Sequence, residues 1–272
     1  MNTLYRRWAE GGAGLLVTGN VMVDRNAIGE PGNVALEDDR DGEALKAWAE
    51  GGRHGGTRLL MQLNHPGRQV PKFLNKESVA PSAVPFREDM QAFFAQAREL
   101  TETEIGGLIE RFARAAAFAA EAGFDGVQIH AAHGYLVSQF LSPHTNRRTD
   151  GWGGSAENRG RFLLEIAKAI RARCPQGFVL SVKLNSADYL RGGLSEEEAM
   201  ESAVALSDMV VDLVEISGGT YEAPAMMVDR KQSERSVQRE AYFLRFAEAL
   251  RERAQVTLAV TGGFRSGAGM AH

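Results

Sequence analysis

Two histidines and a tyrosine lie close together around the end of the apolar run GVQIHA in this 272-residue chain. His130 stands near the end of that run, and His133 and Tyr135 follow within a few residues. If the turn between the two imidazoles is helical, they converge on one point and can donate two hydrogen bonds to a carbonyl or other anionic oxygen. The phenol beside them can deliver a proton to a forming carbanion. The alternative is a structural role, in which these side chains cap a helix and fill a polar cluster.

A metal site is a second interpretation of the two histidines. A catalytic zinc needs about three protein ligands and further groups that orient them. His65 and His144 are the candidates for additional ligands, but no carboxylate pattern supports them. We therefore expect no metal at His130 and His133.

Two more polar side chains lie within apolar runs. Gln62, in MQLNHPGRQ, offers both a donor and an acceptor, which suits a ring edge that presents both, as a flavin does, or a hydrogen bond to core backbone. Lys183, in VKLNSADY, is a cation near the end of an apolar run, where a buried charge requires a partner. It would stabilise an anionic reduced flavin near N1 and C2=O, or form an ion pair with Glu215. The sequence leaves both roles open.

A glycine pair follows the last apolar run, in VTGGFRS. A strand that ends at Gly262 and Gly263 exposes backbone N–H groups, which can cradle a phosphate. Barrels often bind phosphate after their seventh and eighth strands. An ordinary tight turn is the alternative.

Short apolar runs predict the strands that position these residues. They are near-continuous rather than alternating, which is typical of parallel strands buried on both faces. The predicted strands are Gly14–Val21, Arg58–Asn64, Gly126–Ala131, Val179–Asn185, Leu213–Gly218 and Thr257–Gly262.

Amphipathic stretches between these runs predict helices. Capping boxes are expected at Thr101–Glu104 and Ser195–Glu198. Further helices are expected over Thr3–Glu10, from Ser155 to about Arg173, and over Ser236–Arg253. The alternation predicts an α/β fold, a (β/α)₈ TIM barrel formed by residues 1–272 as a single domain with about six of its eight strands. The proline-rich segment from His65 to Leu100 is expected to pass over one end of the barrel as a lid or hairpin.

Composition limits the function classes. The net charge is -4, and nothing in the sequence suggests the clustered basic face that nucleic-acid binding needs. No apolar run reaches the ~18 residues that span a bilayer. The first residues do not resemble a signal peptide, so we expect a cytoplasmic protein. The single cysteine, Cys174, excludes an intrachain disulfide and a four-cysteine iron–sulfur cluster built from this chain alone.

One stretch, HGYLVSQFLSPHTNRRTDGWGGSAENRGRF, resembles the old yellow enzyme or NADH:flavin oxidoreductase family. The resemblance extends over nearly the whole chain, from YRRWAEGGAGLLVTGNVMV to VTGGFRS. It implies an FMN-containing barrel that takes hydride from NADH or NADPH and passes it to a small electron-poor alkene or nitro compound. A homo-oligomer is compatible with it.

The resemblance also implies roles for individual residues. Tyr135 matches the tyrosine that protonates the substrate α-carbon, and His130 and His133 match the pair that binds the substrate oxygen. Lys183 stands where many members have an arginine near flavin N1, which keeps the charge but loses the bidentate fork. The FMN contacts implied by the match are Gln62, Lys183, Gly19, Asn20, Gly262 and Gly263.

Two alternatives remain. The family's first strand and its eighth strand, with a Gly-Arg pair at the phosphate, have no counterpart in the chain, so a barrel fragment unable to hold FMN by itself is one reading. A phosphate-binding aldolase or isomerase is the other, and Lys183 is the lysine placed to form its Schiff base.

Overall fold

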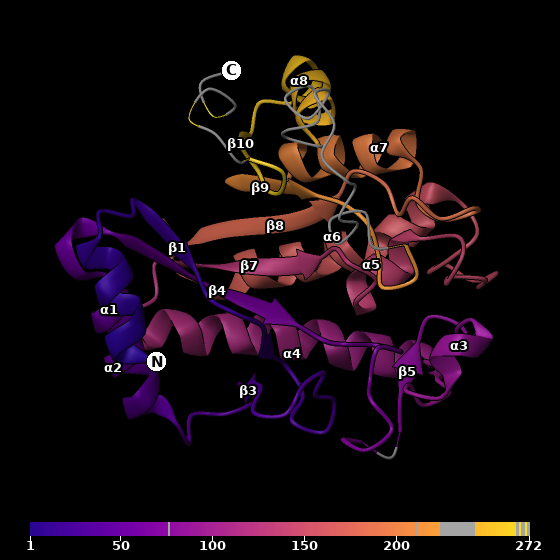
Figure 1. The fold of residues 1–272 in the computed structure, drawn as a ribbon, viewed down its shortest axis with the longest axis horizontal. Helices are drawn as coiled ribbons and strands as arrows, with labels where there is room; N and C mark the ends of the chain where they lie inside the picture. Colours follow the sequence, from indigo (N-terminus) through magenta and orange to yellow (C-terminus); the bar gives the residue numbers. More distant parts are fainter. Residues whose placement is uncertain (76, 210, 224–242, 265–266, 268–269, 271–272) are drawn as a thin grey trace.

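A computed structural model describes residues 1–75, 77–209, 211–223, 243–264, 267 and 270. Its centre is a parallel sheet flanked by helices (Figure 1). The strands follow the order β10-β9-β8-β7-β4-β2-β3, and β1 also pairs with β4. They span β1 Leu15–Val17, β2 Val21–Met22, β3 Val34–Ala35, β4 Arg58–Asn64, β7 Gly126–Ala131, β8 Val179–Asn185, β9 Leu213–Ser217 and β10 Thr257–Val260.

The predicted strands are present, and β4, β7 and β8 have the expected bounds. The first predicted strand is broken, which the sequence pattern did not indicate. After β1, the N–H of Gly19 donates to the hydroxyl of Tyr5 at 3.1 Å instead of continuing the ladder, and β2 then begins at Val21. Within the described residues the sheet does not close on itself, since β10 and β3 end the series. The predicted incomplete barrel is therefore confirmed.

Helices connect the strands. Both capping boxes are confirmed, and Ser155 caps its helix as expected. The predicted start of the last helix at Ser236 lies outside the described residues, and the described helix begins at Leu244. The helices are α1 Asn2–Glu10, α2 Gly42–Gly52, α3 Glu88–Gln91, α4 Glu102–Glu121, α5 Leu136–Leu141, α6 Ala156–Arg173, α7 Glu196–Asp208 and α8 Leu244–Arg253, with the 3₁₀ turn η1 at His54–Gly56.

The two faces of the sheet differ in polarity. Side chains such as Ile129 and Val182 join the apolar core formed with the helices, and we call this side the outer face. The opposite side carries Gln128, His130 and Lys183, and we call it the inner face. Side chains alternate along a strand, so each strand contributes to both faces. The prediction of parallel strands buried on both faces is confirmed for β4, β7 and β8, but the inner face carries polar side chains, which the apolar runs did not indicate.

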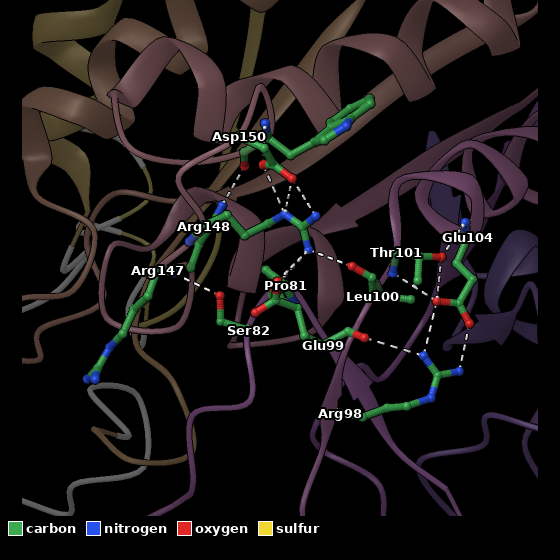
Figure 2. Close-up of polar contacts among 12 residues, drawn as sticks. Pro81, Ser82, Arg98, Glu99, Leu100, Thr101, Glu104, Arg147, Arg148 and Asp150 are labelled. Carbon is green, nitrogen blue, oxygen red and sulfur yellow. Dashed lines mark hydrogen bonds and ion pairs between the residues drawn. The ribbon is translucent and has the colours of Figure 1, made fainter.

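The segment between β4 and α4 carries two short strands, β5 Val79–Ala80 and β6 Arg98–Glu99. These strands pair in parallel, so the predicted hairpin is absent there, and an antiparallel bridge instead joins Pro71 to Phe94. Figure 2 shows how Arg148 ties this segment to the rest of the molecule.

The buried guanidinium of Arg148 donates to the carbonyl oxygens of Pro81 at 3.0 Å and Leu100 at 2.6 Å. Asp150 accepts from its Nε at 3.0 Å (Figure 2). A Cβ at Gly153 would lie 2.6 Å from the Cβ of Arg148, so only glycine fits at this position. The NRRTDGWGG stretch therefore has a structural role: it holds the segment between β4 and α4 in place.

Candidate active site

The two imidazoles meet at the carboxyl end of β7. The ring centroids of His130 and His133 are 5.1 Å apart, with the planes at 74°. The connection is not a helical turn, because His133 has a left-handed backbone with φ of 60°. Its N–H donates to Oδ1 of Asn185 at 3.2 Å, so the neighbouring strand β8 holds this conformation. The two rings therefore lie close together without the helical turn that their spacing suggested.

Both imidazoles are neutral at pH 7. Burial lowers the pKa of His130 well below its usual value, and the charges of His133 and Lys183 lower it further. Burial, with the charge of Lys183, lowers the pKa of His133 to about 4. Nδ1 of His130 accepts the N–H of Ala132 at 3.3 Å, so a neutral ring carries its proton on Nε2. His130 is therefore a hydrogen-bond donor to whatever lies in front of Nε2.

His133 has a partner that can place its proton. Nε2 of His133 lies 2.7 Å from Oγ of Ser217, at the end of β9. When that hydroxyl donates, the proton of the neutral ring is on Nδ1. Both imidazoles then offer an N–H, as binding to a substrate oxygen requires.

Tyr135 lies against this pair. Its ring packs edge-on to His130 with centroids 4.8 Å apart, and its side chain is buried. The hydroxyl lies 3.1 Å from that of Tyr221 and accepts from Nδ2 of Asn20 at 3.4 Å. Burial raises the pKa of Tyr135, Tyr221 adds to the rise and Asn20 opposes it. The phenol therefore keeps its proton at neutral pH and can act as an acid.

A hydrogen-bonded chain crosses the inner face below these rings. Gln62 donates to Gln128 at 2.7 Å, and Gln128 donates to Glu215 at 2.8 Å. Lys183 forms an ion pair with the same carboxylate at 2.8 Å, so the alternative role suggested by the sequence is present. In the sheet register, Lys183 lies opposite both His130 and Glu215. The structure thus brings Gln62 and Lys183 to the same part of the sheet as the imidazoles.

The glycines lie at the same end of the strands. Gly19 is exposed two residues after the end of β1, and Asn20 donates to the hydroxyl of Tyr135. Gly262 and Gly263 follow β10 with left-handed φ values of 91° and 83°. Their placement agrees with the turn predicted after the last apolar run.

The histidines considered for a metal lie elsewhere. His144 faces the carboxylate of Glu222 at 3.8 Å, and His65 lines a cavity of about 690 Å³ with Asp24 and Arg111. In the part of the chain that the structure describes, no cluster of three or more histidine, cysteine, aspartate or glutamate side chains could hold a metal ion. None of the described helices is both long and apolar enough to cross a bilayer.

The large cavity is not the best candidate for the chemistry. It lies between the loop after β2, the segment after β4 and α4, and its arginines are engaged by carboxylates. Arg111 pairs with Glu37 at 2.6 Å, for example. The imidazole pair and Tyr135 instead bring three polar rings together at one strand end.

Comparison with known proteins identifies the family. Residues 1–272 match the model of the NADH:flavin oxidoreductase / NADH oxidase family. The chain belongs to this family. It is 41% identical to the NADH-dependent flavin oxidoreductase iccE of Talaromyces variabilis, over 97% of the chain and 69% of that protein. It is 40% identical to iliE of Neonectria sp. (strain DH2), over 97% of the chain but only 37% of that protein.

Solved structures agree with this membership. An old yellow enzyme homologue from Zymomonas mobilis superposes with a TM-score of 0.79 at 27% identity, over 97% of this chain and 73% of that one. A 2-naphthoyl-CoA reductase gives a TM-score of 0.87 at 28% identity, over 99% of this chain and 42% of that one. These matches confirm the predicted barrel family, whose oxidoreductases use FMN with NADH or NADPH.

Sequence reasoning missed several partners of the site. Gln128 lies two residues before His130 on the same strand, and the alternation of side chains was the signal that could have found it. Tyr221 gave no such signal, because it follows β9 in a loop and reaches Tyr135 only through the fold. Ser217 and Asn185 hold His133 from two neighbouring strands.

Proposed function

We propose that this protein passes hydride from NADH or NADPH through FMN to electron-poor alkenes, such as enones, or to related activated C=C or nitro compounds. The observation that carries the proposal is the convergence of a protonated phenol, Tyr135, on two neutral imidazoles, His130 and His133. A cation, Lys183, lies within electrostatic reach of both imidazoles. Few reactions need neutral oxygen donors and a proton donor around a flat redox ring, and alkene reduction is one of them.

The polar groups of the inner face fit FMN. Gln62 supplies a carboxamide and Lys183 an ammonium group, which suit the pyrimidine edge and the N1 region of a flavin. Asn64, two residues beyond Gln62 on β4, is fully buried, and its carboxamide has no hydrogen-bond partner among the described residues. A polar ring would satisfy such a group.

We assign the remaining contacts by position. Gly19 and Asn20 would meet the ring from the end of β1, and Gly262 and Gly263 would take the phosphate. Residues 1–272 would act as one FMN-binding unit.

When bound, FMN supplies the hydride chemistry between the nicotinamide and the alkene. The protein positions the alkene and controls one proton. His130 and His133 bind the oxygen that activates the double bond, and the charge developing there is stabilised by their N–H groups. Tyr135 gives its proton to the α-carbon, and Tyr221 and Asn20 orient its hydroxyl.

A spectroscopic and kinetic experiment tests the proposal. The purified protein should be yellow, should be bleached by NADH or NADPH under anaerobic conditions, and should recover its colour when an enone is added. The saturated ketone of the same skeleton is the matched control and should not restore the colour. A colourless protein that binds no added FMN would support the inactive-fragment reading instead.

A further inference from the structure

A group that can only accept hydrogen bonds lies at the centre of the inner-face chain. The carboxylate of Glu215 takes one hydrogen bond from Nζ of Lys183 and one from Nε2 of Gln128, each at 2.8 Å. The side chains of Lys183 and Glu215 are only 15% and 16% exposed, so water screens the pair weakly. An ionised carboxylate has no proton to give. Both neighbours are therefore forced to be donors.

This constraint passes along the chain to Gln62. Because Gln128 turns its NH₂ group toward Glu215 and Ser181, its Oε1 faces Gln62. Gln62 must then donate its own NH₂ group inward, at 2.7 Å. The oxygen of Gln62 is left as the end of the carboxamide that can face a ligand. Glu215, which is linked to Gln62 through Gln128, thus determines that Gln62 presents a hydrogen-bond acceptor to the ligand.

The same carboxylate offsets the charge of Lys183. Lys183 and Glu215 act on the pKa of His133 in opposite directions, the cation lowering it and the carboxylate raising it. Both charges therefore contribute to the electrostatic potential at the strand ends where the imidazoles lie. The charge of Lys183 is therefore partly neutralised by Glu215.

We propose that Glu215 is a positioning residue that fixes the acceptor end of Gln62 and offsets the charge of Lys183 toward bound FMN. The inference rests on the proposed function and deepens it. Reduction adds negative charge to the N1–C2=O edge of a flavin, and an uncompensated cation there favours the reduced form. With Glu215 in place, reduced FMN remains the stronger hydride donor, as transfer to an alkene requires.

Midpoint potentials of the FMN-loaded protein test the charge effect. Glu215→Gln should shift the equilibrium with a reference dye toward reduced flavin by about tenfold, which is ~30 mV for a two-electron couple. Lys183→Met should shift it in the opposite direction. The double variant carries neither charge and should return close to the wild-type potential. Glu43→Gln makes the same chemical change in the exposed pair with Lys46 and should leave the potential unchanged.

The double variant also tests the orientation of Gln62. Its net charge equals that of the wild type, but the amide at position 215 can donate as well as accept, so Gln62 is free to turn. The N3–H group of bound FMN should then ionise at a lower pH than in the wild type, because it has lost its fixed acceptor. Absorbance during a pH titration measures this.

If the midpoint potential of FMN bound to the Glu215→Gln variant equals that of the wild type, the inference is overturned. If that variant does not fold, equal potentials in Lys183→Met and the double variant would overturn it as well. An unchanged ionisation of N3–H in the double variant would remove the orienting role. Failure of the wild-type protein to bind FMN would instead contradict the proposed function.

Discussion

The outer and inner faces of the sheet are formed by the same strands but differ in composition, since the outer face is apolar and the inner face is polar. On β8, Val182 is fully buried in the apolar core, whereas its neighbour Lys183 points to the polar inner face. The outer face gains stability from apolar area removed from water. The polar chain from Gln62 through Gln128 to Glu215 is tolerated on the inner face because its members hydrogen-bond to one another. The comparison teaches that the helices hold the strands in place and leave the inner face available for chemistry.

Tyr135→Phe is expected to have the largest effect, and it acts on the inner face. Removing the acid should slow alkene reduction by about 10²- to 10⁴-fold, because general acid catalysis contributes that much. Reduction of the flavin by NADH or NADPH should keep its rate. Stopped-flow absorbance measures the two half-reactions separately, and equal slowing of both would remove Tyr135 from the acid role.

Phe112→Ala tests the outer face. Phe112 on α4 is fully buried in the core, and its loss should lower the free energy of unfolding by ~3–5 kcal/mol. Urea unfolding measures the change. Below the transition, the FMN spectrum should match that of the wild type. A changed spectrum with little loss of stability would show that the two faces are not separable in this way.

His133→Ala returns to the inner face. The variant should lose ~2.7–4 kcal/mol of transition-state stabilisation with an enone, if the imidazole behaves like other oxyanion-hole donors. Steady-state kcat with a saturating enone measures the loss. An acceptor with no oxygen on its activating group provides the control, and a similar loss with that acceptor would contradict the assigned contact.

Stability should fall in mild acid because of the buried imidazoles. The pKa values of His133 and His65 are lowered to about 4 in the folded chain, mainly by burial. Between about pH 6.5 and pH 4 the unfolded chain therefore binds more protons, and the free energy of unfolding decreases as the pH falls. Each imidazole contributes a slope of up to ~1.4 kcal/mol per pH unit.

Urea unfolding at pH 7 and pH 5 measures this dependence. His133→Asn should reduce it, whereas a substitution of the exposed His54 should not. An unchanged slope in His133→Asn would mean that this ring does not resist protonation in the folded state.

The smallest effect is expected at a residue that belongs to neither face. Thr101 accepts the N–H of Glu104 in the capping box of α4. Thr101→Ala should lower the free energy of unfolding by ~1 kcal/mol and leave both half-reactions unchanged. Thr101→Ser keeps the cap and should stay close to the wild type in the same urea experiment.

The sequence predicted the outer face better than the inner one. Apolar runs located β4, β7 and β8 to the residue, because burial against helices acts on each strand separately. The inner face depends on which strands become neighbours. Gln62 and Lys183 were recognised from their types, but the chain that links them through Gln128 forms only when the strands are assembled.

The turn after His130 shows the same limit. A helical turn was the simplest way to bring His130 and His133 together. The fold does it with a left-handed residue that Asn185 holds from β8. Local spacing could indicate that the imidazoles converge, but not which distant side chain makes them do so.

Titration of the cofactor-free protein with FMN tests the central claim most directly. If inner-face side chains from several strands bind the same flavin, the absorbance change should saturate with one FMN bound per chain. Gln62→Ala should weaken binding by about tenfold, the value of one buried hydrogen bond, and the outer-face variant Val182→Ile should bind as the wild type does. No saturable binding by the wild type, or equal affinity in Gln62→Ala, would contradict the account.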